Sequence, residues 1–225
     1  MKATVTPRVK ICCITSVEEA ALAVECGASA LGLVSRMPSG PGVITDEEIA
    51  KITASVPPPI GTFLLTSRQS VSDIIAQHRF CRTNCIQLCD HLTTGTHREL
   101  KDALPGISII QVVHVVGPES VAEACAVAPH VDAILLDSGN QNLAIKELGG
   151  TGKTHDWTLS RTIRESIDIP LFLAGGLTPE NVAQAIREVG PFGLDLCSGV
   201  RTNGKLDEAR LRHFFAAVQS AVQSG

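Results

Sequence analysis

Short apolar runs, largely of β-branched residues, alternate with stretches in which apolar residues recur at helical spacing. This alternation starts at residue 9 and continues almost to the end of the 225-residue chain. The apolar runs are nearly uninterrupted, which is typical of strands covered on both faces of a parallel sheet. The pattern predicts strands at residues 9–14, 30–34, 60–65, 85–88, 107–113, 131–136, 170–174 and 193–197.

Capping signals mark the ends of the stretches with helical spacing. Ser16 and Glu19 have the spacing of a capping box, and Gly27 follows where a C-terminal glycine usually stands. Thr178 followed by Pro179 predicts the start of the seventh helix. The other helices are expected at residues 16–26, 45–55, 97–103, 120–128, 158–166 and 208–222, with the third starting over residues 71–77.

Eight strands alternating with eight helices over 225 residues indicate repeated βα units and a parallel sheet. At this length, eight units fit a closed (β/α)₈ TIM barrel, an α/β fold, better than an open doubly wound sheet. No linker or change of composition divides the chain, so residues 1–225 are expected to form a single barrel domain. In such a barrel, the chemistry lies at the carboxyl ends of the strands.

Composition narrows the classes of partner. The formal net charge is −4, and the chain has one Trp and no Tyr, which disfavours binding to nucleic acids or to anionic membranes. No apolar stretch is long enough for a membrane span, and the first residues do not resemble a signal peptide. The eight cysteines are therefore interpreted as reduced thiols in a cytoplasmic protein. The sequence does not indicate an oligomeric state.

Two strand ends carry reactive side chains. Side chains alternate along a strand, so Lys10 and Cys12 share one face and Cys13 takes the other. The apolar neighbours suit the helix side, which directs Lys10 and Cys12 to the barrel axis. Asp137 ends the sixth apolar run, where this fold places catalytic groups. The alternatives are that Cys12 is a core thiol and that Asp137 only caps the following turn.

The seventh and eighth predicted strands both end in loops that contain glycine. Gly175 and Gly176 follow the seventh strand, and Ser198 and Gly199 follow the eighth. Glycine allows the backbone to approach a ligand closely, and these two loops form the common phosphate site of the TIM barrel. The sequence therefore predicts a phosphate site at this edge.

Two other patterns resemble known motifs but lack the required spacing. The loop at residues 149–154 resembles a nucleotide-binding P-loop, but the first required glycine would fall on Glu147. This favours a flexible active-site loop. Cys81, Cys85 and Cys89 could suggest zinc, but their spacing does not match a zinc knuckle and apolar strand residues separate them. No metal is expected.

Several segments together resemble phosphoribosylanthranilate isomerase, an enzyme family of tryptophan biosynthesis. The resemblance extends from residue 10 to about residue 218. It is carried by residues 10–12, 30–34, 87–88, 136–138, 149–154, 156–157, 173–182 and 198–200. It implies an isomerase of aromatic amino-acid biosynthesis that converts N-(5′-phosphoribosyl)anthranilate to 1-(2-carboxyphenylamino)-1-deoxyribulose 5-phosphate. This Amadori rearrangement is an aldose–ketose isomerisation that needs an acid and a base but no cofactor.

The resemblance also implies roles for individual residues. Asp137 would be the general acid that opens the ribose ring, and Cys12 the general base that removes the C2′ proton. Lys10 is a candidate for stabilising the Cys12 thiolate. Arg36 follows the second strand, where the family places an arginine for the anthranilate carboxylate. The remaining substrate-binding residues would be Gly175, Gly176, Ser198 and Gly199 at the phosphate, Gly150 and Gly152 closing over the substrate, and Asp195 shaping the pocket.

The sequence departs from the family pattern at several positions. Cys13 replaces a glycine and is expected to face the helices, while Cys197 and Arg201 stand where serine and glutamate are common. The loop at residues 35–42 lacks the usual Ser-Pro-Arg run, and Cys89-Asp90 replaces His-Gly. These changes keep two alternatives open: a diverged barrel isomerase or lyase for another phosphorylated sugar or aminosugar, and a non-catalytic phospho-ligand binding protein.

Overall fold

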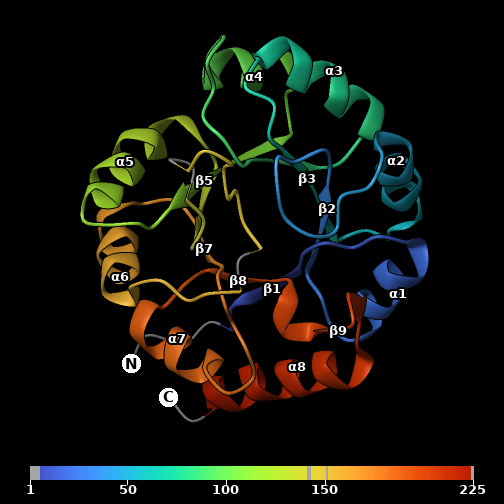
Figure 1. Cartoon of the computed structure of the whole chain (residues 1–225), viewed down its shortest axis with the longest axis vertical. Coiled ribbons are helices and arrows are strands. Elements are labelled where there is room, and N and C mark those ends of the chain that lie inside the picture. Colours follow the sequence, from blue (N-terminus) through green and yellow to red (C-terminus); the bar gives the residue numbers. More distant parts are fainter. Residues whose placement is uncertain (1–5, 141–142, 151, 224–225) are drawn as a thin grey trace.

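A computed structural model describes residues 6–140, 143–150 and 152–223 of the chain. In these residues, eight parallel strands close into a barrel, and the helices form a ring around it (Figure 1). The (β/α)₈ barrel predicted from the sequence is confirmed. The strands of the barrel are β1 (Arg8–Ile11), β2 (Ala30–Val34), β3 (Gly61–Thr66), β4 (Cys85–Leu88), β5 (Ser108–His114), β6 (Ala133–Asp137), β7 (Leu171–Leu173) and β8 (Gly193–Leu196).

One main helix follows each strand. Ser16 accepts a hydrogen bond from the backbone N–H of Glu19 and so caps the first helix, and Gly27, at φ 108°, follows its end. A short antiparallel pair, β9 (Arg201–Thr202) and β10 (Lys205–Leu206), precedes the last helix. The helices are α1 (Val17–Glu25), α2 (Asp46–Ser55), α3 (Val71–Cys81), α4 (His97–Ala103), α5 (Glu119–Val127), α6 (Trp157–Ser166), α7 (Val182–Val189) and α8 (Glu208–Gln223), with short 3₁₀ turns η1 (Ala128–His130) and η2 (Ser198–Val200).

The predicted start of the seventh helix was wrong. We expected Thr178 to cap this helix, but α7 begins at Val182 with Asn181 as its N-terminal cap residue. The Asn181 side chain accepts a hydrogen bond from the Thr178 N–H at 2.8 Å and donates one to the Gly176 carbonyl at 2.9 Å. These bonds stabilise a turn over residues 178–181 before the helix starts, and they anchor the loop after β7.

The barrel closes where β1 pairs with β8. In this pairing, Lys10 lies beside Asp195, and Ile11 lies beside Leu196. The two strands are separated by most of the chain, but they bring the ends of the first and last βα units together.

Two apolar layers hold the structure together. The larger layer lies between the strands and the helices, and Leu31, Leu64 and Phe214 are among its fully buried members. The smaller layer fills the barrel interior, where the rings of Phe63 and Phe172 meet edge to face at 5.9 Å. The nearly continuous apolar strands follow from this arrangement, since each strand is covered on both faces.

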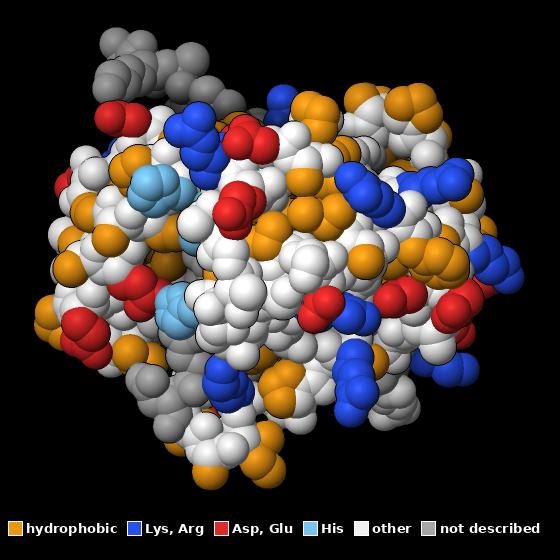
Figure 2. Space-filling model, turned by 90° about the horizontal axis from the view of Figure 1, so that it is seen from above, with side chains coloured by type: hydrophobic (Ala, Val, Ile, Leu, Met, Phe, Trp, Pro, Cys, Tyr) orange, Lys and Arg blue, Asp and Glu red, His pale blue; other side chains and the backbone are white. Residues whose placement is uncertain are grey.

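The outer surface carries charges of both signs. Figure 2 shows acidic and basic side chains mixed over the face seen from above. This face therefore does not present the basic stripe that is typical of nucleic-acid binding. Within the described ranges, no helix combines the length and apolar character needed to cross a membrane.

Candidate active site

A cavity opens at the carboxyl end of the barrel. It contains about 700 Å³ of empty space including its mouth. Its wall comes from the ends of β1, β2, β3, β4, β6, β7 and β8 and from the loops that follow β2 and β6. Nine residues singled out in the sequence line it: Cys12, Asp137, Gly150, Gly152, Gly175, Gly176, Asp195, Ser198 and Gly199.

Lys10 and Asp195 form a buried ion pair at the base of this cavity. The Lys10 Nζ donates a hydrogen bond to the Asp195 Oδ1 at 2.8 Å, and Lys10 is fully buried. Burial alone would lower the pKa of Lys10, but the charge of Asp195 and that of a Cys12 thiolate outweigh burial and raise the pKa. Lys10 therefore stays positively charged. Its side chain points into the barrel, which is the orientation that strand alternation predicted.

The Cys12 thiol lies beside this cation. A methyl group at Gly32 of β2 would come within 2.8 Å of the Cys12 Sγ and 3.0 Å of the Lys10 Nζ, so the two atoms flank the same small gap. A fixed positive charge near a thiol favours the thiolate. The predicted relation between Lys10 and Cys12 thus has a geometric basis, and Gly32 leaves the space that it requires.

Asp137 is a buried carboxyl at the end of β6. Its Oδ1 accepts a hydrogen bond from the backbone N–H of Ser138 at 2.7 Å. Burial raises the pKa of Asp137, although the hydrogen bond from Ser138 and the charge of Lys10 oppose this effect. A Cβ on Gly149 would come within 2.7 Å of the Asp137 Oδ2, so the following loop passes directly over the carboxyl. Such a carboxyl is suited to donate a proton.

The glycine loops after β7 and β8 pack against each other. A Cβ on Gly199 would collide with the carbonyl oxygen of Leu177, so only glycine allows this approach of the two backbones. Gly152 faces this region from the loop after β6, because a Cβ there would contact the Ser198 Oγ at 3.4 Å. Main-chain groups of three loops are therefore gathered at one end of the cavity.

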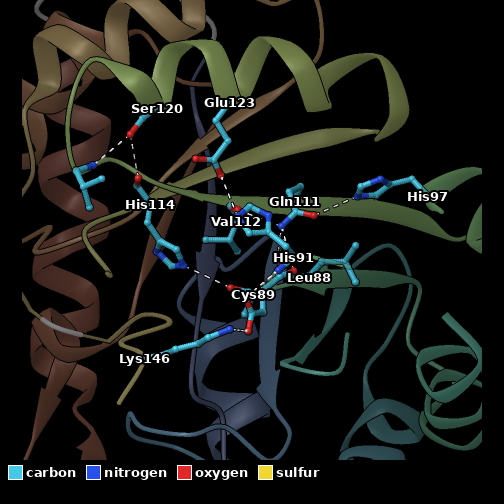
Figure 3. A network of polar contacts seen from close by, with 12 residues as sticks. Leu88, Cys89, His91, His97, Gln111, Val112, His114, Ser120, Glu123 and Lys146 are labelled. Carbon is cyan, nitrogen blue, oxygen red and sulfur yellow. Dashed lines mark hydrogen bonds and ion pairs between the residues drawn. The ribbon is translucent and has the colours of Figure 1, made fainter. Parts of the chain in front are cut away.

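Two loops cover the other end of the cavity and are tied together. The Ser39 Oγ in the loop after β2 donates a hydrogen bond to the Lys146 carbonyl in the loop after β6 at 2.7 Å. The Lys146 side chain donates to the Asp90 carboxylate, after β4, at 2.5 Å. Figure 3 shows Lys146 at this position, next to the network that contains Cys89 and His114. Lys146 thus links the β2 and β6 loops to the end of β4.

Two predicted residues have positions that differ from those expected. The prediction that Cys13 faces the helices was wrong, because Cys13 lines the cavity. It lies beyond the end of β1 and has φ 62°, so the alternation of a strand no longer applies. The Arg36 side chain is exposed and is not among the residues that line the cavity. Its role in binding a carboxylate stays a prediction.

Several cavity residues were not selected as site residues from the sequence. Gln87 on β4 lines the cavity while almost fully buried, and no partner for its Oε1 is found in the described part of the chain. The sequence feature that could have identified Gln87 is a polar side chain within an otherwise apolar strand. The covering residues Ser39, Gly40 and Pro41 gave no such signal, because their place depends on contacts with a loop more than a hundred residues away.

Metal ligation was also considered. The described residues contain no group of three or more His, Cys, Asp or Glu side chains that could hold a metal ion. Cys81, Cys85 and Cys89, the possible zinc ligands, are all free thiols.

A closed barrel with a carboxyl, a thiol and glycine-rich loops around one cavity at its carboxyl end defines the class of (β/α)₈-barrel enzymes. The sequence profile of N-(5′-phosphoribosyl)anthranilate (PRA) isomerase matches residues 9–217. N-(5′-phosphoribosyl)anthranilate isomerase 2 of Methanosarcina mazei is 37% identical over 209 residues, which cover 92% of each chain. The isomerase of Haloferax volcanii is 37% identical over 216 residues, covering 95% of this chain and 94% of the relative. The chain therefore belongs to the N-(5′-phosphoribosyl)anthranilate isomerase family.

Solved structures of the family have the same fold. The phosphoribosyl anthranilate isomerase of Thermotoga maritima superimposes with a TM-score of 0.78 at 31% identity, covering 95% of this chain and 99% of that one. Another phosphoribosyl anthranilate isomerase, solved in complex with reduced 1-(o-carboxyphenylamino)-1-deoxyribulose 5-phosphate, gives a TM-score of 0.76 at 29% identity with the same coverage. A phosphorylated ligand thus binds to a relative of this fold.

Proposed function

We propose that this protein catalyses the Amadori rearrangement of N-(5′-phosphoribosyl)anthranilate to 1-(2-carboxyphenylamino)-1-deoxyribulose 5-phosphate in tryptophan biosynthesis. The observation that carries the proposal is one cavity lined by both a buried carboxyl, Asp137, and a thiol beside a buried cation, Cys12. Membership of the isomerase family supports the same reaction. We further propose that the protein acts in the cytoplasm, where its eight free thiols stay reduced.

Asp137 is the general acid in this proposal. The substrate ribose is a closed ring, and protonation of its ring oxygen allows the C1′–O bond to break and a Schiff base to form. Burial raises the pKa of the Asp137 carboxyl, which favours the protonated form that can donate from an Oδ atom. Gly149 places the β6 loop directly over this carboxyl and, in the proposed complex, over the reacting ring.

Cys12 is the general base. Once the Schiff base has formed, its positive nitrogen makes the C2′ proton acidic, and the Cys12 thiolate removes it to give an enolamine. The enolamine then tautomerises to the aminoketose. The charge of Lys10, fixed by Asp195 at 2.8 Å, lies beside the sulfur atom that takes up this proton. No redox cofactor is required, because the electrons move only within the substrate.

The phosphate is assigned to the glycine end of the cavity. We propose that main-chain N–H groups of Gly175, Gly176, Ser198 and Gly199 bind its oxygens, with Gly152 closing from the β6 loop. The packing of these loops supports this assignment. The substrate is thereby held at one end while its anilino ring points to the end covered by the loop after β2.

The end of the cavity that would hold the anthranilate ring supports a second candidate function. Because Arg36 does not line the cavity, the chain could act on another phosphorylated sugar or aminosugar whose recognition needs no cation there. Rescue of a tryptophan auxotroph that lacks the isomerase distinguishes the two candidates. Purified protein should also consume phosphoribosylanthranilate in a fluorescence assay, and Cys12→Ala and Asp137→Asn should each reduce kcat by about 10²–10⁴-fold. Soluble protein that neither rescues growth nor turns over this substrate would refute the proposed reaction.

A further inference from the structure

Two thiols that the proposed reaction does not use touch each other inside the cavity. The Sγ atoms of Cys13 and Cys197 lie 2.7 Å apart and share a hydrogen bond, although the residues are 184 positions apart in the chain. Both residues line the cavity. A disulfide bond requires a separation of about 2.05 Å, so only a small movement separates the two sulfur atoms from bonding distance.

The backbone directs Cys13 toward Cys197. Cys13 has φ 62°, a left-handed conformation that is unfavourable for a residue with a side chain. The Arg201 guanidinium donates a hydrogen bond to the Cys13 carbonyl, and Glu19 holds Arg201 by an ion pair at 2.9 Å. Strain maintained by such contacts is typical of functional positions. Cys13 and Cys197 are also departures from the family pattern, and the fold brings these two departures into contact.

The surroundings give the two thiols different reactivity. The hydrogen bond with Cys13 and the nearby Arg201 charge lower the pKa of Cys197, although burial opposes them. Hydrogen bonds with Cys12 and Cys197, together with burial, raise the pKa of Cys13. Cys197 is also less buried than Cys13. Cys197 is therefore the thiol that is more readily ionised and more accessible to a small reagent in the cavity.

We propose that Cys13 and Cys197 are a redox modification site that forms a reversible disulfide on reaction with hydrogen peroxide. The Cys197 thiolate attacks a peroxide oxygen, the O–O bond breaks, and Cys197 becomes a sulfenic acid as water leaves. The Cys13 sulfur then attacks the sulfenic sulfur, forming the S–S bond and releasing a second water molecule. Two thiols and one hydrogen peroxide thus give one disulfide and two waters. A dithiol reductant restores both thiols by exchange.

Oxidation at this site slows turnover, an effect that depends on the proposed function. Cys13 follows the general base Cys12, and Cys197 precedes Ser198 at the proposed phosphate site. Drawing the two sulfur atoms together moves both neighbours, and small displacements of reacting groups have large effects on rate. The bond also places a rigid bridge in the cavity wall. We expect oxidised protein to be slower by about tenfold or more.

The test begins with reduced, full-length protein and stoichiometric hydrogen peroxide. Digestion without reductant, followed by mass spectrometry, should identify a peptide that joins Cys13 to Cys197. Isomerase activity should fall in parallel and return after treatment with dithiothreitol. Cys197→Ser and Cys13→Gly, each compared with its own reduced activity, should not show the reversible loss. Cys125→Ser, which removes an exposed thiol outside the cavity, should behave as the unmodified protein does.

Three results would overturn the inference. They are the absence of the Cys13–Cys197 peptide after oxidation, a linkage of either residue to Cys12 instead, or an equal reversible loss of activity in Cys197→Ser. Because the peptide is detected without an activity assay, failure of this inference is distinguishable from failure of the proposed reaction. A protein that forms the linkage but lacks isomerase activity in its reduced state would refute only the reaction.

Discussion

Gly32→Ala should displace the proposed base, because the added methyl would lie 3.1 Å from the Cys12 Cα. Gly32 lies in β2, and its backbone conformation is not the left-handed one that requires glycine. The added methyl would come within 2.8 Å of the Cys12 Sγ and 3.0 Å of the Lys10 Nζ. Ordinary contacts are near 3.5 Å, so the thiol must move by about 0.7 Å, and the lysine must also shift.

This displacement sets the expected effect. A misplacement of about 1 Å at a reacting group reduces the rate by about 10²-fold, so kcat should fall by about 10–100-fold. The phosphate end lies away from Gly32, so KM should change little. Steady-state measurement of phosphoribosylanthranilate consumption gives both constants, and circular dichroism with thermal unfolding shows whether the barrel is intact.

Gly106→Ala is the matched control, because its added methyl would meet nothing within 4 Å. Its φ of 85° makes the substitution strained, so it should lower stability while leaving kcat unchanged. A folded Gly32→Ala protein with a kcat within twofold of the unmodified value would contradict the position assigned to the thiol. A change in KM alone would show that the methyl hinders binding rather than proton transfer.

Three further predictions concern stability and substrate binding. Asp137→Asn should raise Tm by about 2–4 °C at pH 8, since asparagine keeps the bond from Ser138 and removes a buried carboxyl whose pKa is raised. The gain should vanish as pH falls through the ordinary aspartate pKa of about 3.9, because Asp137 is then neutral in the unfolded chain as well, and scanning calorimetry at about pH 8 and pH 3 checks this. Burial lowers the pKa of His155 to about 4, so as pH falls this side chain takes up a proton in the unfolded chain before it does so in the folded one. The free energy of unfolding should therefore decrease by up to roughly 3 kcal/mol between pH 6.5 and pH 4. In His155→Gln, the free energy of unfolding measured with urea should decrease less over this pH range. An unchanged dependence on pH would contradict the prediction. Lys146→Met removes the side-chain partner of the buried Asp90 and so frees the β6 loop from the end of β4, while the Ser39 bond to the main-chain carbonyl of residue 146 remains. KM should rise by up to about tenfold, equivalent to about 1.4 kcal/mol, with kcat less affected. An unchanged KM would show that the ion pair does not assist binding.

The elements of the barrel were predictable because their signals are local. The apolar runs predicted β2 and β4 with their observed limits, and the helical pattern predicted α4 at residues 97–103, as observed. The inward orientation of Lys10 and Cys12 followed from alternation along a strand. The gathering of most candidate site residues at one end followed from the rule that parallel barrel strands end on the same side.

The remaining features depend on contacts that no local pattern records. Cys13 turns into the cavity because Arg201, near the end of the chain, binds its carbonyl. The start of α7 shifts because the Asn181 side chain stabilises the preceding turn. Arg36 was placed by the family pattern, but the altered loop takes a path that leaves its side chain exposed.

The pairing of β1 with β8 couples assembly of the protein to its activity. Lys10 meets Asp195 only across this last pair of strands, so the charge beside Cys12 has no fixed counter-ion until the final βα unit has docked. A chain emerging from the ribosome can therefore form most of its barrel while the proposed catalytic centre is still incomplete. Shortened products that lack β8 would bury a lysine without its carboxylate, a defect that quality-control proteases can detect as instability.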